Sequence, residues 1–188
     1  MSSPNQLSNQ IFSGGFKELL TSELLSIVGG LIAGTILAIH TEKLLLLPGM
    51  LVLLPGFLEL RGNISGSFAS RLSSGLFLGL IDPKKWDSRV IRGNLLSSFT
   101  LVLLICGVLG IMAFGFTYFI FHVASLKILV VPIIAGILAN AIEIPLTLVA
   151  TLYLFRRGHD PNNIMGPFVT STGDITSILA LLLVLSLI

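Results

Sequence analysis

Long apolar runs separated by short polar segments make up most of the sequence after residue 20. A helix needs about 20 predominantly apolar residues to cross the hydrocarbon core of a bilayer. The pattern predicts five such spans, at 20–40, 44–80, 94–121, 127–154 and 166–188. We therefore expect an all-α integral membrane protein with five transmembrane helices.

The second predicted span is too long for one straight crossing. Pro48-Gly49 and Pro55-Gly56 interrupt it. The sequence predicts a short half-helix, a break near Pro55, and then a longer helix that ends near Leu80. Broken helices are tolerated at membrane depth only where the freed backbone groups face protein or water.

Composition supports a membrane location. The 188 residues are 54% hydrophobic and 11% charged, with a mean hydropathy of +0.99. Soluble domains carry about 25% charged residues, so this chain cannot cover a surface that faces water. We expect one membrane domain over 19–188 and a disordered cytoplasmic tail over 1–18. The net charge of +2 is too small to indicate a nucleic-acid partner.

The basic residues predict the orientation. One side of a five-span bundle receives seven of them and the other side receives two, Lys43 and Lys127. The seven are Lys17, Lys84, Lys85, Arg89, Arg92, Arg156 and Arg157. The positive-inside rule then places the N-terminus in the cytoplasm and the C-terminus outside, in a multi-pass protein of the cell membrane. The chain shows no convincing internal repeat, so any symmetry of a pore must come from a second subunit.

Polar residues recur at helical spacing in three of the spans. They are Glu59, Asn63, Ser67, Ser70 and Ser74 in the second span; Asn140, Glu143, Thr147 and Thr151 in the fourth; and Asn163, Pro167, Thr170, Asp174 and Ser177 in the fifth. Lipid-facing surfaces are not built in this way, so the stripes are expected to point toward each other or toward water.

Hydrogen bonding between helices explains the Ser and Thr members of these stripes without any further function. The carboxylates need another explanation. A lone acid such as Asp174 inside a membrane segment costs roughly 2.5 kcal/mol or more and usually faces a partner, a cavity or an ion path. Glu59 and Glu143 have a second interpretation, because either could form a structural ion pair with Arg61 or Arg71.

Carboxylate, amide and hydroxyl oxygens are hard ligands that suit Mg²⁺, Ca²⁺ or Mn²⁺. The candidate metal ligands on the stripes are Asp174, Asn63, Thr170, Glu59, Glu143 and Asn140. Enzyme signatures are missing from the sequence: it has no HExxH or Walker A motif, and Ser65 stands one position off a G-x-S-x-G elbow. The sequence thus gives no support for catalysis, and we expect no enzyme.

Two segments resemble the MgtE-type magnesium transporters and their eukaryotic solute-carrier relatives. Pro55 to Leu72 is similar to the Pro…Gly-Asn…Ser-x-Arg-Leu segment of that family's second helix. Asp160 to Asp174 is similar to its Asp-Pro…Pro-x-Val-Thr-(Thr/Ser)-x-x-Asp segment. Ala139-Asn140 and the turn at Arg156-Arg157-Gly158 also fit, so that the resemblance covers about 40–188.

The resemblance implies a homodimeric channel or transporter for Mg²⁺, with Mn²⁺ or Co²⁺ as other cargo, and a pore lined by the second and fifth helices. It makes Asp174 the central ion-binding acid, Asn63 the pore-helix asparagine, and Thr170 a group beside the same ion. Glu59 and Glu143 are predicted as ligands from their stripe positions alone, whereas Asn140 also fits the resemblance in the fourth helix. Bacterial members carry large sensor domains before the first helix, whereas only about twenty residues precede it here, so a gate of that kind is not expected.

Two other functions fit the same residues. One is a proton- or sodium-coupled carrier that uses Asp174 as the coupling acid. The other is a structural membrane subunit whose carboxylates pair with Arg61 and Arg71. Flux measurements in proteoliposomes separate these alternatives.

Overall fold

The computed structural model describes residues 15–85 and 88–187, and over these residues the regular elements are all helices. They are α2 (Phe16–Ile39), α3 (Thr41–Leu45), α4 (Met50–Phe77), α5 (Arg89–Phe121), α6 (Lys127–Arg156) and α7 (Pro161–Leu187). The all-α prediction is confirmed. Most of the predicted tail over 1–18 lies outside the described residues, and α2 already begins at Phe16.

Four of the helices in the described segments are long and apolar enough to cross a membrane: α2, α5, α6 and α7. The chain is therefore a multi-pass membrane protein. Helix α4 has 28 residues, enough to span the hydrocarbon core, but its polar stripe makes it less apolar than the other four. Five crossings accordingly stay a prediction, which depends on α4.

The break expected near Pro55 is not present. Helix α4 runs without interruption through Pro55, and the chain instead turns between α3 and α4, at 46–49. Gly49 has a φ of 84° there, and a Cβ atom on it would collide with Thr117 and Ile128. The left-handed conformation costs L-residues other than glycine roughly 1–2 kcal/mol, which explains why a glycine stands at this turn. The chain therefore changes direction at Pro48-Gly49, and Pro55 lies inside the helix that follows.

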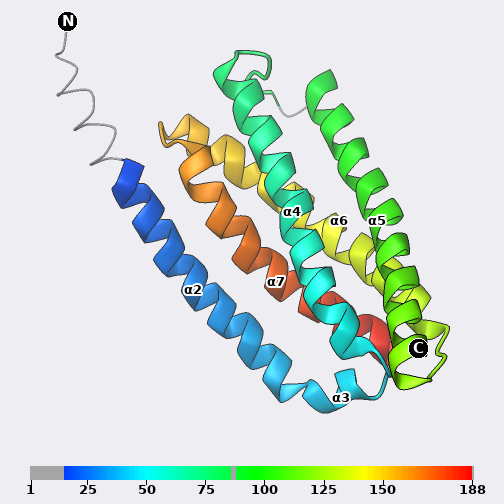
Figure 1. Ribbon diagram of the computed structural model, residues 1–188. Coiled ribbons are helices and arrows are strands. Elements are labelled where there is room, and N and C mark those ends of the chain that lie inside the picture. Colours follow the sequence, from blue (N-terminus) through cyan, green and yellow to red (C-terminus); the bar gives the residue numbers. More distant parts are fainter. Residues whose placement is uncertain (1–14, 86–87, 188) are drawn as a thin grey trace, which may run out of the picture.

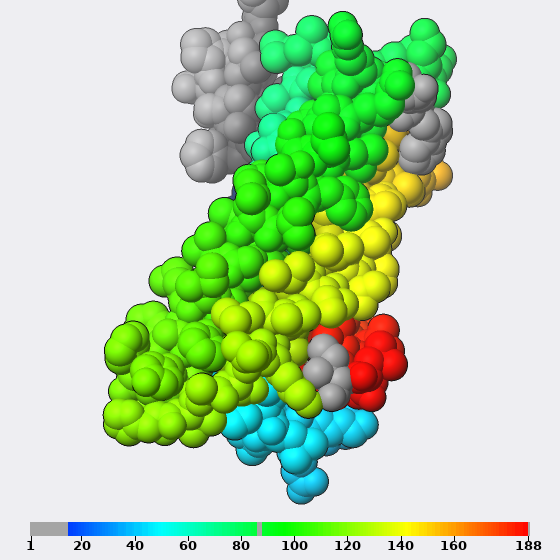
Figure 2. Space-filling view, turned by 90° about the vertical axis from the view of Figure 1, so that its right-hand side faces the viewer, coloured from blue at the N-terminus to red at the C-terminus, as the bar shows by residue number. Residues whose placement is uncertain are grey.

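Helix α4 lies at the centre of the bundle and packs against α5, α6 and α7, as Figure 1 shows. Helix α2 lies alongside α7 at one edge of the bundle, and α5 and α6 pack together at the other. Figure 2 shows this second edge, where α5 and α6 cover the surface. Helix α7 is thus packed between α2 on one side and α4 and α6 on the other.

The core is formed where α4 meets its neighbours. Phe57, Phe68 and Leu72 of α4 are fully buried, and Val102 of α5 and Ile144 of α6 join the same cluster. These α4 residues share one face of the helix, which leaves the opposite face to the polar stripe. The apolar core therefore packs against the face of α4 that lies opposite the polar stripe.

Candidate functional site

A groove of about 440 Å³ runs between α4 and α7. Four of the six predicted metal ligands line it: Glu59 and Asn63 from α4, and Thr170 and Asp174 from α7. The other lining residues are small or apolar: Pro55, Leu58, Gly62, Gly66, Gly166 and Val169. Two stripes that are more than a hundred positions apart in the sequence are thus brought together by the packing of α4 against α7.

Local sequence explains the shape of the groove. On α4, Gly62 and Gly66 are one turn apart, and Gly166 adds a third glycine from α7. The absence of side chains at these positions leaves space between the two helices. A Cβ atom on Gly66 would lie 4.0 Å from Cγ2 of Val169, so the helices are close to contact there. The longer polar side chains of Glu59, Asn63, Thr170 and Asp174 line the same groove as these glycines.

The groove is rich in oxygen atoms and negative in charge. Asn63 Nδ2 donates to Glu59 Oε1 at 3.1 Å, which leaves the amide oxygen of Asn63 available. Thr170 Oγ1 donates its proton to the carbonyl oxygen of Gly166 at 3.0 Å. The lone pairs of this hydroxyl oxygen can therefore face the groove. Glu59 and Asp174 bring two carboxyl groups to the same open space. A cation between them would be attracted by both.

The other two predicted ligands lie elsewhere. Asn140 and Glu143 of α6 are fully buried and do not line the groove. Asn140 Oδ1 accepts a hydrogen bond of 2.8 Å from Arg61 Nη1. Glu143 accepts hydrogen bonds from Thr172 at 2.9 Å and from Thr176 at 3.3 Å.

The arginines of α4 point away from the groove residues. Arg61 is fully buried, and its Nη1 donates to Asn140 Oδ1. The ion pair of Glu143 with Arg61 stays a prediction, because the contacts of Glu143 described above are to Thr172 and Thr176. Arg71 Nε donates to Asn94 Oδ1 of α5 at 2.7 Å. Asp82, an acid that could have paired with Arg71, instead lies 3.7 Å from Lys85.

The polar stripe of α4 continues beyond the groove along an exposed face. Glu59, Asn63, Ser67, Ser70 and Ser74 are all exposed in the single chain. The stripe of α6 is buried completely, including Thr147 and Thr151. The prediction that the stripes face inward therefore describes α6, whereas α4 presents its stripe to the surroundings of this chain.

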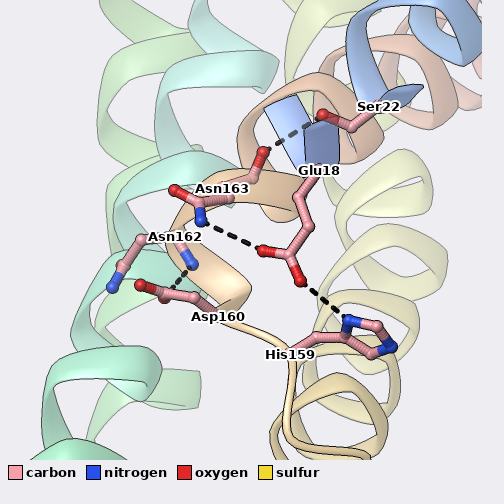
Figure 3. Close-up of polar contacts among 6 residues, drawn as sticks. All are labelled: Glu18, Ser22, His159, Asp160, Asn162 and Asn163. Carbon is pink, nitrogen blue, oxygen red and sulfur yellow. Dashed lines mark hydrogen bonds and ion pairs between the residues drawn. The ribbon is translucent and has the colours of Figure 1, made fainter. Parts of the chain in front are cut away.

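A polar contact that the sequence analysis did not predict joins α2 to the start of α7 (Figure 3). Glu18 lies between two partners: His159 Nδ1 is 2.8 Å from Oε1, and Asn163 Nδ2 donates to Oε2 at 3.1 Å. Ser22 Oγ donates to the carbonyl oxygen of Asn163 at 3.1 Å. The one signal in the sequence was the acid Glu18 in the first turn of an apolar helix, and it did not indicate which residues would contact it. The contact between Asn163 and Glu18 also gives a structural role to the first member of the α7 stripe.

Within 15–85 and 88–187, no three His, Cys, Asp or Glu side chains gather closely enough to hold a metal ion. Each chain thus brings two carboxylates, Glu59 and Asp174, to the groove, together with the neutral oxygens of Asn63 and Thr170. This set can attract a divalent cation and share its water shell. It does not enclose a dehydrated ion.

A family model described as MgtE, divalent cation transporter, matches residues 54–184, which is more than half of the chain. Solute carrier family 41 member 3 of Rattus norvegicus is 28% identical to the chain over 170 residues. That similarity covers 87% of this chain and 36% of the relative, so the chain spans about a third of the relative's length. The matched range includes both helices of the groove and the buried α6 stripe. The chain belongs to the MgtE family of divalent cation transporters, which are transporters and not enzymes.

Proposed function

We propose that two copies of this chain form a homodimer that carries Mg²⁺ across the cell membrane. The pore lies on the two-fold axis and is lined by α4 and α7, the helices of the groove. Asp174 is the central cation-binding acid, Asn63 and Thr170 contact the hydrated ion, and Glu59 adds negative charge at the same level. The N-terminus is cytoplasmic and the C-terminus extracytoplasmic.

The observation that carries this proposal is the groove itself. Glu59 and Asp174 stand on different helices, yet both line one open space with Asn63 and Thr170. Ionisable groups at membrane depth are rare and mark ion pathways when they face a cavity. Hard oxygen ligands of this kind favour Mg²⁺, Ca²⁺ or Mn²⁺ over softer metals.

A second copy is proposed because the α4 stripe needs a polar neighbour. Five polar residues on one exposed face of α4 would be unfavourable against lipid tails. A two-fold axis beside this face brings two α4 helices together. It also doubles the acids, so that two Asp174 and two Glu59 side chains surround one path.

The size of the groove suits a hydrated ion. Mg²⁺ gives up its water reluctantly, and it usually keeps several waters while it contacts one or two carboxylates. Six waters occupy about 180 Å³ at liquid density, which is less than the volume of about 440 Å³ in the groove of one chain. Mn²⁺ and Co²⁺ are further cargo that the same ligands would accept.

The experiment is Mg²⁺ uptake into proteoliposomes by the wild type and by Asp174→Asn. The variant keeps the size and hydrogen-bonding capacity of the side chain but removes two charges from the dimer axis, so uptake is expected to collapse. Asp82→Asn is the matched control, because Asp82 pairs with the exposed Lys85 and lies outside the groove. Near wild-type uptake by Asp174→Asn would show that the acid is structural and that the path lies elsewhere.

The same vesicles separate the alternatives. Uptake that follows a pH or sodium gradient, with no response to membrane potential alone, assigns a coupled carrier that uses Asp174. A folded dimer that moves no divalent cation under any gradient assigns a structural subunit. Uptake that follows membrane potential is the expected result for a channel.

A further inference from the structure

A second polar cluster lies within the bundle, away from the groove. Asn140 and Glu143 of α6 hold one residue of α4, Arg61, and two of α7, Thr172 and Thr176. We call these five residues the α6 clamp. Asn140, Glu143 and Arg61 are fully buried. The clamp therefore joins the two groove helices through a third helix that does not line the groove.

On α7, the clamp contacts the side of the helix that faces away from the groove acid. Thr172 and Thr176 each stand two positions from Asp174. Two positions correspond to a rotation of about 200° around an α-helix, nearly the opposite face. Thr172 Oγ1 lies 2.9 Å from Glu143 Oε1 and 2.8 Å from the carbonyl oxygen of Phe168, and Thr176 Oγ1 lies 3.3 Å from Glu143 Oε2 and 3.1 Å from that of Gly173. When these hydroxyls donate to Glu143, they tie α7 to α6 in the rotation that turns Asp174 toward the groove.

The same arrangement is found on α4. Glu59 and Asn63 stand two positions before and after Arg61. Arg61 points into the bundle, where Nη1 donates to Asn140 Oδ1 at 2.8 Å and the guanidinium attracts Glu143. Glu59 and Asn63 therefore lie on the exposed face, in the groove. One turn of α6 holds the buried sides of both helices whose other sides carry the proposed ion ligands.

We propose that the α6 clamp positions the groove ligands, and that Asn140 and Glu143 act as positioning residues and do not contact the cargo. This inference rests on the proposed function of the groove. Through Thr172 and Thr176, Glu143 sets the rotation of Asp174. Through Arg61, Asn140 and Glu143 set the rotation of Glu59 and Asn63. The affinity of the groove for a divalent cation thus depends on residues that the ion does not touch.

The rest of the α6 stripe shows why ordinary packing does not explain the clamp. Thr147 and Thr151 are as buried as Glu143, but their hydroxyls donate to carbonyl oxygens of α6 itself, at 2.7 Å in both cases. Both carboxylate oxygens of Glu143 instead accept hydrogen bonds from residues of α7. A buried carboxyl group is costly unless it is hydrogen-bonded, so Glu143 requires the partners that α7 supplies. An apolar residue would pack here without fixing the rotation of α7.

The test removes the two hydroxyls and keeps the side-chain shape. Thr172→Val/Thr176→Val is reconstituted into proteoliposomes, and the initial rate of Mg²⁺ uptake is measured against Mg²⁺ concentration. Loss of hydrogen bonds to a charged group is expected to raise KM about tenfold, with a far smaller change in maximal uptake. Thr147→Val is the matched control, since it removes a threonine hydroxyl that is even more deeply buried but donates within α6 and does not reach α7. Its KM should stay within about twofold of wild type.

Rescue by the conservative change completes the design. Thr172→Ser/Thr176→Ser keeps both hydroxyls and should restore KM to near the wild-type value. Should the double valine variant not fold, the single variants Thr172→Val and Thr176→Val replace it, and KM must rise in both relative to Thr147→Val. A KM for the valine variants equal to that of Thr147→Val overturns the clamp.

The outcomes of this test and of the functional test are distinct. Wild-type protein that takes up no divalent cation refutes the function of the groove, whatever the threonine variants do. Wild-type uptake that collapses in Asp174→Asn, with an unchanged KM in the valine variants, supports the groove and refutes the clamp.

Discussion

Asp174 and Asn63 line the same groove, and the proposed function gives them different contacts with the ion. Asn63 contributes a neutral amide, and a hydrogen bond from it to a water of the ion is worth on the order of 1–2 kcal/mol. Asn63→Ala is therefore expected to lower Mg²⁺ uptake about tenfold, less than Asp174→Asn, which removes two charges from the dimer. The measurement is uptake by both variants at equal protein and lipid. The reverse order would place the ion nearer Asn63 than Asp174.

Arg71 is a charged residue of α4 that does not line the groove. Its guanidinium donates to Asn94 of α5 at 2.7 Å, and a cation inside the path would repel Mg²⁺. Arg71→Ala is expected to leave the KM for Mg²⁺ unchanged and to lower the free energy of unfolding by about 0.5–1.5 kcal/mol. Asn94→Ala should cause a similar loss, because it removes the same hydrogen bond. Loss of Mg²⁺ binding by folded Arg71→Ala would show that Arg71 acts at the path.

A single glycine allows the backbones of α5 and α6 to lie close together. A Cβ atom on Gly110 of α5 would lie 2.8 Å from the carbonyl oxygen of Leu129 in α6, so these two backbones are nearly in contact. Gly110→Ala should force the helices apart and cost about 1–3 kcal/mol, as other overpacked sites do. Gly107→Ala on the same helix meets no atom within 4 Å and should not destabilise the protein. Thermal unfolding in detergent compares the two variants.

Helix α2 is attached differently, since α7 is the one long helix against which it packs extensively. Its first turn is joined to α7 through Glu18, His159 and Asn163. Glu18→Ala is expected to increase hydrogen exchange of the amides in the first turns of α2 while α5 and α6 stay protected. Glu23→Ala, which removes an exposed acid from the same helix, should leave exchange unchanged. Equal exchange in the two variants would mean that apolar packing alone holds α2.

The assembled protein is expected to be a dimer with its two α4 stripes facing each other. Light scattering should give twice the chain mass of 20.1 kDa after the detergent is subtracted. A cysteine at Ser67 or Ser70 should cross-link across the axis, whereas one at Ser97, exposed on α5, should not. The native Cys106 is buried and does not interfere. A strictly monomeric protein that still conducts Mg²⁺ would rule out the proposed axis.

The apolar runs were enough to predict the all-α membrane fold and most helix positions, because length and hydropathy alone determine which segments can enter a bilayer. Some helices begin at other residues than predicted. Helix α7 begins at Pro161 and not at residue 166, because a proline suits the first turn of a helix. The predicted break at Pro55 was wrong because a proline can be accommodated inside a membrane helix. The chain turns instead at Gly49, just before α4, where φ is positive.

The sequence by itself also determined which polar residues share a helix face, because the helical repeat of 3.6 residues follows from local geometry. It could not determine which faces meet. Tertiary packing brought Glu59 and Asn63 to Thr170 and Asp174, and it turned the equally regular stripe of Asn140 and Glu143 into the buried clamp. The physical reason is that a stripe in the sequence indicates only that one face of a helix is polar. Whether that face meets water, an ion or another helix depends on the neighbouring helices, and long-range contacts between separate segments decide which helices those are.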